Sequence, residues 1–148
     1  MYEFDRPDWV TIQTIENAHE STVWSVSFSH DGKYLASVGS DSNIKIYEFI
    51  PRTETESAKL MLIITYDIEN CKWPLYSVSW NCQANFFAVG SGDKKIRIFE
   101  LKEREKLINL ETTVECDDEV NNVSWSRNEP KLLVAALDNG QAAVYKLH

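Results

Sequence analysis

The stretch Thr22-Val23-Trp24-Ser25-Val26-Ser27-Phe28 decides the fold, because the chain repeats its pattern twice. The later repeats read Pro74-Leu75-Tyr76-Ser77-Val78-Ser79-Trp80 and Glu119-Val120-Asn121-Asn122-Val123-Ser124-Trp125. Phe28 and Trp80 lie 52 residues apart, and Trp80 and Trp125 lie 45 apart. After each repeat come a turn, a small apolar run and a run that ends in an aromatic residue. Short strands recurring at roughly 40–50 residues predict the blades of a β-propeller.

A fourth strand between repeats completes each predicted blade. Residues 60–66 and 106–112 form two such runs, and residues 9–15 form another before the first repeat. Turn residues interrupt the chain about every ten residues, which disfavours helices. We therefore expect an all-β chain of about three four-stranded antiparallel blades. Residues 1–16 are assigned to the last strands of a preceding blade, and 17–67, 68–114 and 115–148 to three repeats.

Three blades are too few for a ring, since closed propellers have about four to eight. The sequence therefore predicts a partial propeller that is open or completed by another chain. An open array leaves apolar sheet faces and unpaired strands exposed. We expect poor solubility in isolation, or association with itself or with a complementary propeller fragment.

Composition narrows the classes of partner and compartment. The chain has a formal net charge of -8 and is 43% hydrophobic. An acidic surface repels phosphate, so nucleic acids and anionic membranes are disfavoured as partners. Three cysteines without a CxxC pair do not indicate a disulfide framework, and no basic-then-apolar leader opens the sequence. These features favour the cytoplasm, with the nucleus as a second compartment.

The first repeat carries a polar pattern that resembles the WD40 family. In that family a histidine, a turn aspartate, a strand serine or threonine and a tryptophan form a hydrogen-bonded set that fixes each blade. The resemblance implies this structural role for His19, Ser37, Asp41, Tyr47, Asp93 and Asn139. Cys71 and Cys116 stand at the histidine position of the later repeats, so apolar packing should dominate there.

The same resemblance implies where partners bind. In WD40 propellers the loops before the first strand and between the second and third strands meet on one face. The matching positions are Glu20, Thr22, Trp24, Ser40, Lys72, Pro74, Tyr76, Gly92, Asp117, Glu119, Asn121 and Asp138. Trp24 and Tyr76 are the strongest candidates, because exposed aromatic side chains anchor interfaces. The alternative for both is packing between blades.

A narrower resemblance concerns the whole combination of repeats. The insertion at 51–57, the run from Ser91 to Glu100 and the ending through Asn128-Glu129-Pro130 resemble the last three blades of a seven-bladed WD40 family. That family is the WD40 subunit of the cytosolic iron–sulfur protein assembly (CIA) targeting complex. The resemblance implies a scaffold that binds assembly subunits and apo-protein clients. The alternatives are another WD40 adaptor (a ubiquitin-ligase substrate receptor, or a chromatin or signalling scaffold) and a non-functional fragment.

Catalytic and metal-site interpretations are weak, and we expect no enzyme, cofactor or metal. His19, His30 and His148 do not combine with a nucleophile and an orienting group. Cys71, Cys82 and Cys116 are too few for an iron–sulfur cluster, which needs about four ligands. The run 117–119 lacks the alternating ligand spacing of a calcium loop.

Overall fold

The structure, a computed structural model, describes residues 9–148, and these residues fold into strands and loops without a helix. The strands are β1 (Val23–Phe28), β2 (Tyr34–Gly39), β3 (Asn43–Ile50), β4 (Lys59–Asp67), β5 (Leu75–Trp80), β6 (Phe86–Ser91), β7 (Lys95–Lys102), β8 (Leu107–Glu115), β9 (Val120–Trp125), β10 (Leu132–Leu137) and β11 (Ala142–Lys146). No helix in this part of the chain is long and apolar enough to cross a membrane.

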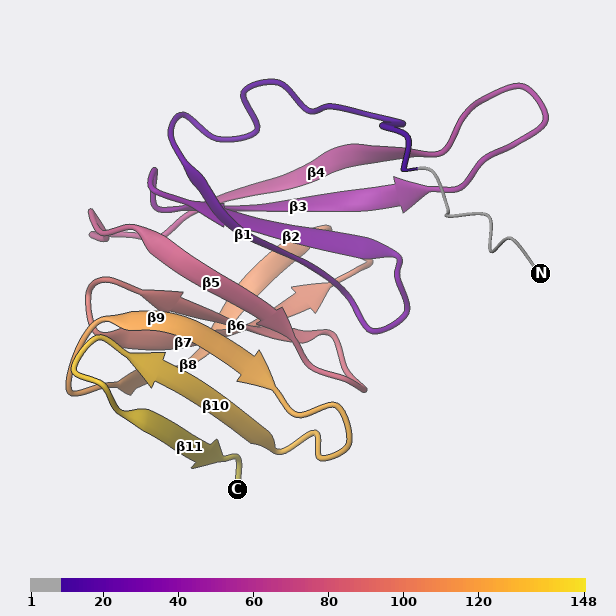
Figure 1. The fold of residues 1–148 in the computed structure, drawn as a ribbon. Coiled ribbons are helices and arrows are strands. Elements are labelled where there is room, and N and C mark those ends of the chain that lie inside the picture. The colour runs from indigo at the N-terminus through magenta and orange to yellow at the C-terminus, as the bar shows by residue number, and fades with distance from the viewer. Residues whose placement is uncertain (1–8) are drawn as a thin grey trace, which may run out of the picture.

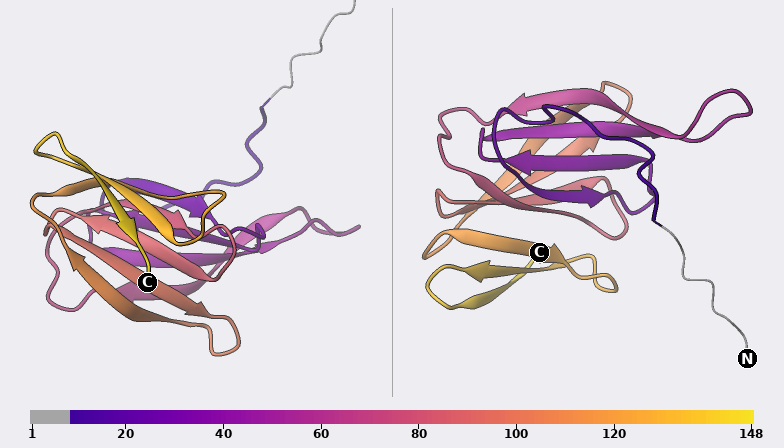
Figure 2. Two further views of the ribbon diagram at one scale, coloured as in Figure 1. Left: turned by 90° about the horizontal axis from the view of Figure 1, so that it is seen from below. Right: turned by 45° about the horizontal axis from the view of Figure 1, so that its top comes forward.

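The strands form three antiparallel sheets, which are the predicted blades. Blade 1 has the order β1-β2-β3-β4, blade 2 has β5-β6-β7-β8, and blade 3 has β9-β10-β11. The sheets stack in chain order, with blade 1 at one end and blade 3 at the other (Figures 1 and 2). They do not close into a ring. The predicted all-β fold and the open, partial propeller are therefore confirmed.

Local sequence sets the strand ends. Between β1 and β2, Gly32 has a φ of 72°, a backbone conformation that glycine adopts without strain. The Asp31 carboxylate accepts hydrogen bonds from the Ser29 hydroxyl (2.7 Å) and the Lys33 backbone N–H (3.0 Å). This turn fixes the register of the hairpin. The insertion at 51–58 forms an exposed loop between β3 and β4.

Two apolar layers hold the stack together. The layer between blades 1 and 2 is formed by fully buried side chains that include Ile44, Leu75 and Phe99. Phe87 stacks on Phe99 with ring centroids 5.4 Å apart. Val120 anchors the second layer, where blade 3 covers blade 2. Burying a side chain of this size stabilises a fold by about 1.5–3 kcal/mol, so these layers dominate its stability.

Serine hydroxyls link the first strands of neighbouring blades. Ser25 of β1 accepts a hydrogen bond from the Val78 backbone N–H (3.3 Å). Ser77 of β5 accepts one from the Val123 N–H (3.1 Å), and Ser79 accepts one from the Trp125 N–H (3.0 Å). Each serine thus satisfies a backbone donor of the next blade. The Ser-x-Ser pattern of the repeats was the signal for this role.

Residues 9–15 do not form the strand that we predicted. Trp9, Val10 and Ile12 are 96%, 77% and 70% exposed. Gln13 bonds to a strand edge, through side-chain hydrogen bonds with the Leu60 backbone. A fourth strand needs a third strand beside it, and none lies there in the described residues. Residues 1–8 lie outside the described residues, and the assignment of 1–16 to a preceding blade stays a prediction.

Candidate protein-binding face

One edge of the stack collects the loops that precede the first strand of each blade and those that join the second and third strands (the left edge in Figure 1). We call this edge the loop face; it comprises residues 19–22, 40–42, 71–74, 92–94, 116–119 and 138–140. Backbone hydrogen bonds pair the loops within each blade: Ser40 N–H to Thr22 C=O, Gly92 N–H to Pro74 C=O, and Asp138 N–H to Glu119 C=O. The repeated bonds give the three blades the same loop geometry.

An aromatic pair lies where the loops of blades 1 and 2 meet. Trp24 and Tyr76 pack edge to face, with ring centroids 5.4 Å apart. The Trp24 indole N–H donates to the Ser40 hydroxyl at 2.6 Å. Trp24 is nevertheless 50% exposed, while Tyr76 is half-buried. Trp24 therefore presents a rigid, amphipathic surface to solvent, which is typical of an interface anchor.

Trp73 extends this aromatic surface, and the sequence analysis missed it. Its side chain is 52% exposed. A Cβ placed on Gly92 would lie 3.3 Å from Tyr76 and 3.4 Å from Trp73, so Gly92 lies directly beneath both rings. Burial, followed by the charge and hydrogen bond of Glu119, raises the pKa of Tyr76. The only signal for Trp73 was its position next to the predicted contact Pro74.

Acidic side chains share the loop face with the aromatic rings, and Glu119 and Asp138 lie close enough to Tyr76 to act on its hydroxyl. Asp138 accepts a hydrogen bond from the Asn121 amide at 3.1 Å, and both residues are exposed. Asp118 forms an ion pair with Lys94 at 3.4 Å. Glu20 and Asp117 are also exposed. The loop face therefore combines apolar rings with an excess of negative charge, which suits a partner that carries basic side chains.

The predicted contact residues differ in how far they reach solvent. Those that are exposed are Glu20, Thr22, Trp24, Lys72, Asp117, Asn121 and Asp138. Those that are partly buried are Ser40, Pro74, Tyr76 and Glu119, and Gly92 is buried. Gly92 therefore packs beneath the rings of Tyr76 and Trp73 and is not accessible to a partner.

Beneath the loop face, blade 1 contains a buried polar network. His19 Nδ1 lies 2.9 Å from Asp41 Oδ1, and His19 Nε2 lies 2.8 Å from the Ser37 hydroxyl. The Asp41 carboxylate also accepts the backbone N–H groups of Glu20 and Asn43. Burial would raise the pKa of Asp41, but these hydrogen bonds hold it below its ordinary value. Tyr47, the fourth predicted member, is buried nearby without a hydrogen bond to the other three in the described structure.

Blade 2 replaces this network with an ion pair that the sequence analysis missed. Cys71 takes the histidine position, and its Sγ lies 3.8 Å from Asp93 Oδ2. Arg97 approaches Asp93 with both terminal nitrogens, at 3.1 Å to Oδ1 and 2.5 Å to Oδ2. Both side chains are largely buried, at 9% and 13% exposure. The sequence did contain an indication of this ion pair. Arg97 follows Asp93 by four residues, and blade 2 has Cys71 where blade 1 has the histidine that binds its aspartate.

Blade 3 has neither arrangement. Asn139 accepts only the backbone N–H of Gln141, at 3.1 Å, and is exposed. Cys116 at the histidine position contacts the Tyr145 hydroxyl at 3.3 Å. Burial, followed by Cys116, raises the pKa of Tyr145 to about 12. The buried polar interactions beneath the loop face are therefore most numerous in blade 1, reduced to one ion pair in blade 2, and weakest in blade 3.

These networks predict how stability depends on pH. The pKa values of Asp41 and Asp93 both lie below the ordinary 3.8, because His19 and Arg97 respectively favour the ionised carboxylates over the opposing effect of burial. Their stabilising contribution is present above that value and is lost as pH falls through the lowered pKa. Urea unfolding between about pH 5 and about pH 2 should show this loss. An Asp93→Asn variant should lose less on acidification, and an unchanged acid slope would contradict the assignment.

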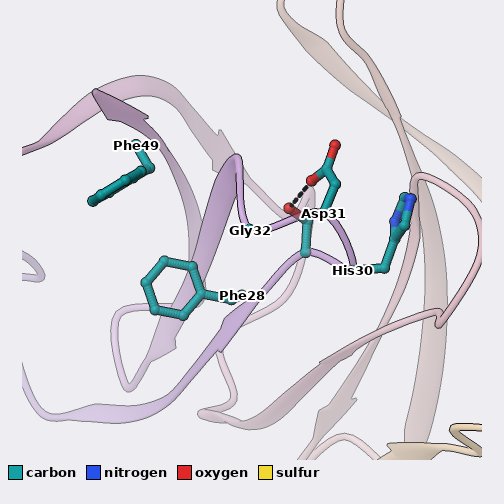
Figure 3. Close-up of a pocket in the computed structure, with 6 residues that line it drawn as sticks. Phe28, His30, Asp31, Gly32 and Phe49 are labelled. Carbon is teal, nitrogen blue, oxygen red and sulfur yellow. Dashed lines mark hydrogen bonds between the residues drawn. The ribbon is translucent and has the colours of Figure 1, made fainter. Parts of the chain in front are cut away.

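The loop face carries no cluster of metal-ligating side chains in the described residues. In residues 9–148 no three His, Cys, Asp or Glu side chains gather as a metal site. A hollow of about 500 Å³ is lined by Phe28, Phe49 and the turn at 29–32, on the opposite edge of blade 1. Figure 3 shows its two rings on one side of the turn and His30 on the other. It is a shallow, open depression beside the free flank of β1.

Comparisons with known proteins agree with this architecture. The family model described as "WD domain, G-beta repeat" matches residues 9–48 and 64–100. A probable cytosolic iron-sulfur protein assembly protein CIAO1 homolog of Caenorhabditis elegans is 38% identical over 134 residues, covering 85% of this chain and 40% of that protein. The probable assembly protein Ciao1 of Aedes aegypti is 32% identical over 152 residues, covering 94% and 44%.

A solved structure shows the same fold. The β-propeller domain of Cps50 (Swd1) from Myceliophteria thermophila superimposes with a TM-score of 0.71 at 14% identity, over 85% of this chain and 40% of that one. The chain spans less than half the length of the curated relatives that it matches. The repeats, the stacked antiparallel sheets and the family match together establish that the chain belongs to the WD40-repeat family.

Proposed function

We propose that this chain is a protein-binding scaffold of cytosolic iron–sulfur protein assembly, which holds assembly subunits and apo-protein clients on its loop face. The observation that carries the proposal is the similarity to relatives named for that process, over 85% of this chain at 38% identity. Those names also favour the cytoplasm as its compartment. The role of the loop face is to bind proteins and not to perform chemistry.

The geometry of the loop face supports the binding part of the proposal. Trp24 is held by Ser40 and Tyr76, so little side-chain entropy is lost when a partner covers it. Glu20, Asp117 and Asp138 are exposed on the same loop face and give it negative charge. A rigid aromatic centre inside a charged rim is the usual composition of a binding hot spot.

Affinity purification tests the assignment to this process. The chain, tagged at one end and expressed in cells, should recover iron–sulfur assembly subunits and apo-proteins that later receive clusters, identified by mass spectrometry. A Trp24→Ala/Tyr76→Ala variant serves as the matched control for loop-face binding. Recovery of a ubiquitin ligase or of chromatin proteins in place of assembly subunits would contradict the proposal.

Single substitutions test the aromatic pair itself. Trp24→Ala should weaken partner binding by about 2 kcal/mol, a roughly 30-fold rise in Kd, because a half-exposed anchor is lost. The free energy of unfolding should change by less than about 1 kcal/mol, since the ring is not in the core. Titration calorimetry and urea unfolding measure the two quantities. If Trp24→Ala lowered stability as much as binding, the ring would be a packing residue.

A further inference from the structure

A hollow of about 330 Å³ lies on the edge of the stack opposite the loop face, where the first strands of the three blades end (Figure 1). Every blade contributes to its lining: Ser27 and His30 come from blade 1, residues 79–82 from blade 2 and residues 124–127 from blade 3. Figure 3 shows His30 on the opposite side of its turn from the two phenyl rings. We call this space the polar hollow, because most of its lining side chains are polar.

The polar hollow is free of acidic side chains, although the chain as a whole is acidic. The chain has 23 Asp and Glu against 15 Lys and Arg, yet none of the described residues that line the hollow is acidic. Arg127 in the lining is exposed and forms no ion pair within residues 9–148. The carboxylates nearest in sequence, Asp31 and Glu129, accept backbone N–H groups within their own turns. The positive charge of Arg127 is therefore available to an anion.

Serine hydroxyls add hydrogen-bond donors to the lining. Ser79 Oγ accepts the Trp125 backbone N–H at 3.0 Å, and Ser126 Oγ accepts two backbone N–H groups of its own turn, at 3.3 and 3.0 Å. A hydroxyl whose oxygen accepts from the backbone keeps its own proton to donate. The Asn81 amide donates to the Pro130 carbonyl at 2.7 Å, which ties the turn of blade 3 to blade 2. The donors are therefore held in place before a ligand arrives.

Two buried indole N–H groups beside the polar hollow lack an acceptor. Among the buried side-chain nitrogens and oxygens of the described structure, only Trp80 Nε1 and Trp125 Nε1 have no hydrogen-bond partner. Both residues line the hollow, and they are 6% and 7% exposed. A buried donor without an acceptor destabilises a fold, so each such group requires an explanation. An occupant rich in acceptors, reached directly or through ordered water, would provide one.

The acidic loop face lies too far away to repel an anion from this hollow. β1, β5 and β9 run from the loop face to the hollow, and each has six residues. Six strand residues span about 20 Å. Charges more than about 10 Å apart are largely screened at 0.1 M salt. The groups that line the hollow therefore determine which ligand it takes.

We propose that the polar hollow binds phosphate, as the free ion or as the phosphate group of a small molecule. Arg127 pairs with the oxyanion, because a guanidinium presents two parallel N–H donors to such a group. The hydroxyls of Ser79 and Ser126 donate to its other oxygens, and His30 adds an imidazole N–H. The hollow has room for a tetrahedral ion and ordered water. This site lies away from the loop face, and it is independent of the proposed role in iron–sulfur assembly.

Nuclear magnetic resonance of the indole N–H protons tests the site in the purified full chain. Sodium phosphate, titrated at constant pH and ionic strength, should shift the resonances of Trp80 and Trp125. Those of Trp24 and Trp73 on the loop face should stay unchanged. Glycerol 3-phosphate, titrated in the same way, distinguishes the two sources of the ligand. Tighter binding of the ester assigns the site to phosphorylated small molecules, and equal or weaker binding assigns it to the free ion.

Two arginine variants test the source of the positive charge. Arg127→Ala should raise the Kd for phosphate at least about tenfold, because a charge-assisted contact is lost, and Arg127→Lys should lose less. Arg104→Ala serves as the matched control, since Arg104 is an exposed arginine in the turn between β7 and β8. It should bind phosphate as the unchanged chain does.

Alkylation of the free cysteines provides a measurement that does not depend on those variants. Cys82 lines the polar hollow, whereas Cys116 lies on the loop face, and both are partly exposed thiols. Phosphate should slow the modification of Cys82 by iodoacetamide and leave that of Cys116 unchanged, as measured by peptide mass spectrometry. Unshifted Trp80 and Trp125 resonances would overturn the proposal. So would an unprotected Cys82, or equal losses of phosphate binding in Arg127→Ala and Arg104→Ala.

Discussion

Replacing Arg97 by methionine should lower the free energy of unfolding by about 3 kcal/mol, because it leaves the Asp93 carboxylate buried without its cation. The two side chains meet through two nitrogen–oxygen contacts and are 9% and 13% exposed. Ser91 and Cys71 also lie close to that carboxylate, but neither carries a charge that could replace the guanidinium, and a thiol is a weak donor. Urea unfolding at neutral pH measures the loss.

Two further variants separate the ion pair from the bulk of the arginine. Lys45→Met changes the equivalent position of blade 1, where the described residues show no ion pair, and should cost less than about 1 kcal/mol. The double variant Asp93→Ala/Arg97→Met should recover part of the loss, since no buried charge then remains. Equal losses for Arg97→Met and Lys45→Met would show that the ion pair does not stabilise blade 2.

Replacing His19 by alanine should cost about 2–4 kcal/mol, because it removes a buried ring, leaves the Ser37 hydroxyl without its partner and removes one of the hydrogen bonds to Asp41. The His19 side chain has no exposed surface, and it contacts both Asp41 and Ser37. The loop before β1 should also loosen, since Asp41 positions the Glu20 backbone. Urea unfolding measures the stability, and hydrogen exchange at the Glu20 amide measures the loop.

The matched control is Cys71→Ala, at the equivalent position of blade 2. The Cys71 thiol has only long contacts, at 3.7 Å and 3.8 Å, so its removal should cost about 1 kcal/mol. If His19→Ala proved no more destabilising than Cys71→Ala, the polar network of blade 1 would not be a source of stability.

The repeats made most of the fold predictable. Three aligned stretches, each followed by two further strands, indicated three antiparallel blades, and the structure has them. Short strands with alternating apolar and polar residues, repeated at the length of a propeller blade, are compatible with few other folds. The missing closure also followed, because the number of repeats can be counted directly.

Details that depend on how side chains meet in three dimensions were only partly predictable. The spacing of Asp93 and Arg97 is compatible with an ion pair, but whether this pair takes the place that His19 and Asp41 have in blade 1 depends on how Arg97 reaches Asp93 in the folded chain. Residues 9–15 have the composition of a strand, but pairing requires a neighbour that local sequence cannot supply. Likewise, the exposure of Trp24 and Trp73 depends on how far Tyr76 fills the space between blades.

The serine hydroxyls between blades have a consequence for how such a protein changes in evolution. Blades 1 and 2 carry a serine acceptor on one flank, Ser25 and Ser77, and the matching N–H donors are Val78 and Val123 of the blades that follow. Blade 3 has Asn122 at the equivalent position. Duplicating blade 2 would therefore repeat the same serine-to-amide bond at the new junction, and gene duplication could add such a unit in one step without changing this hydrogen bond.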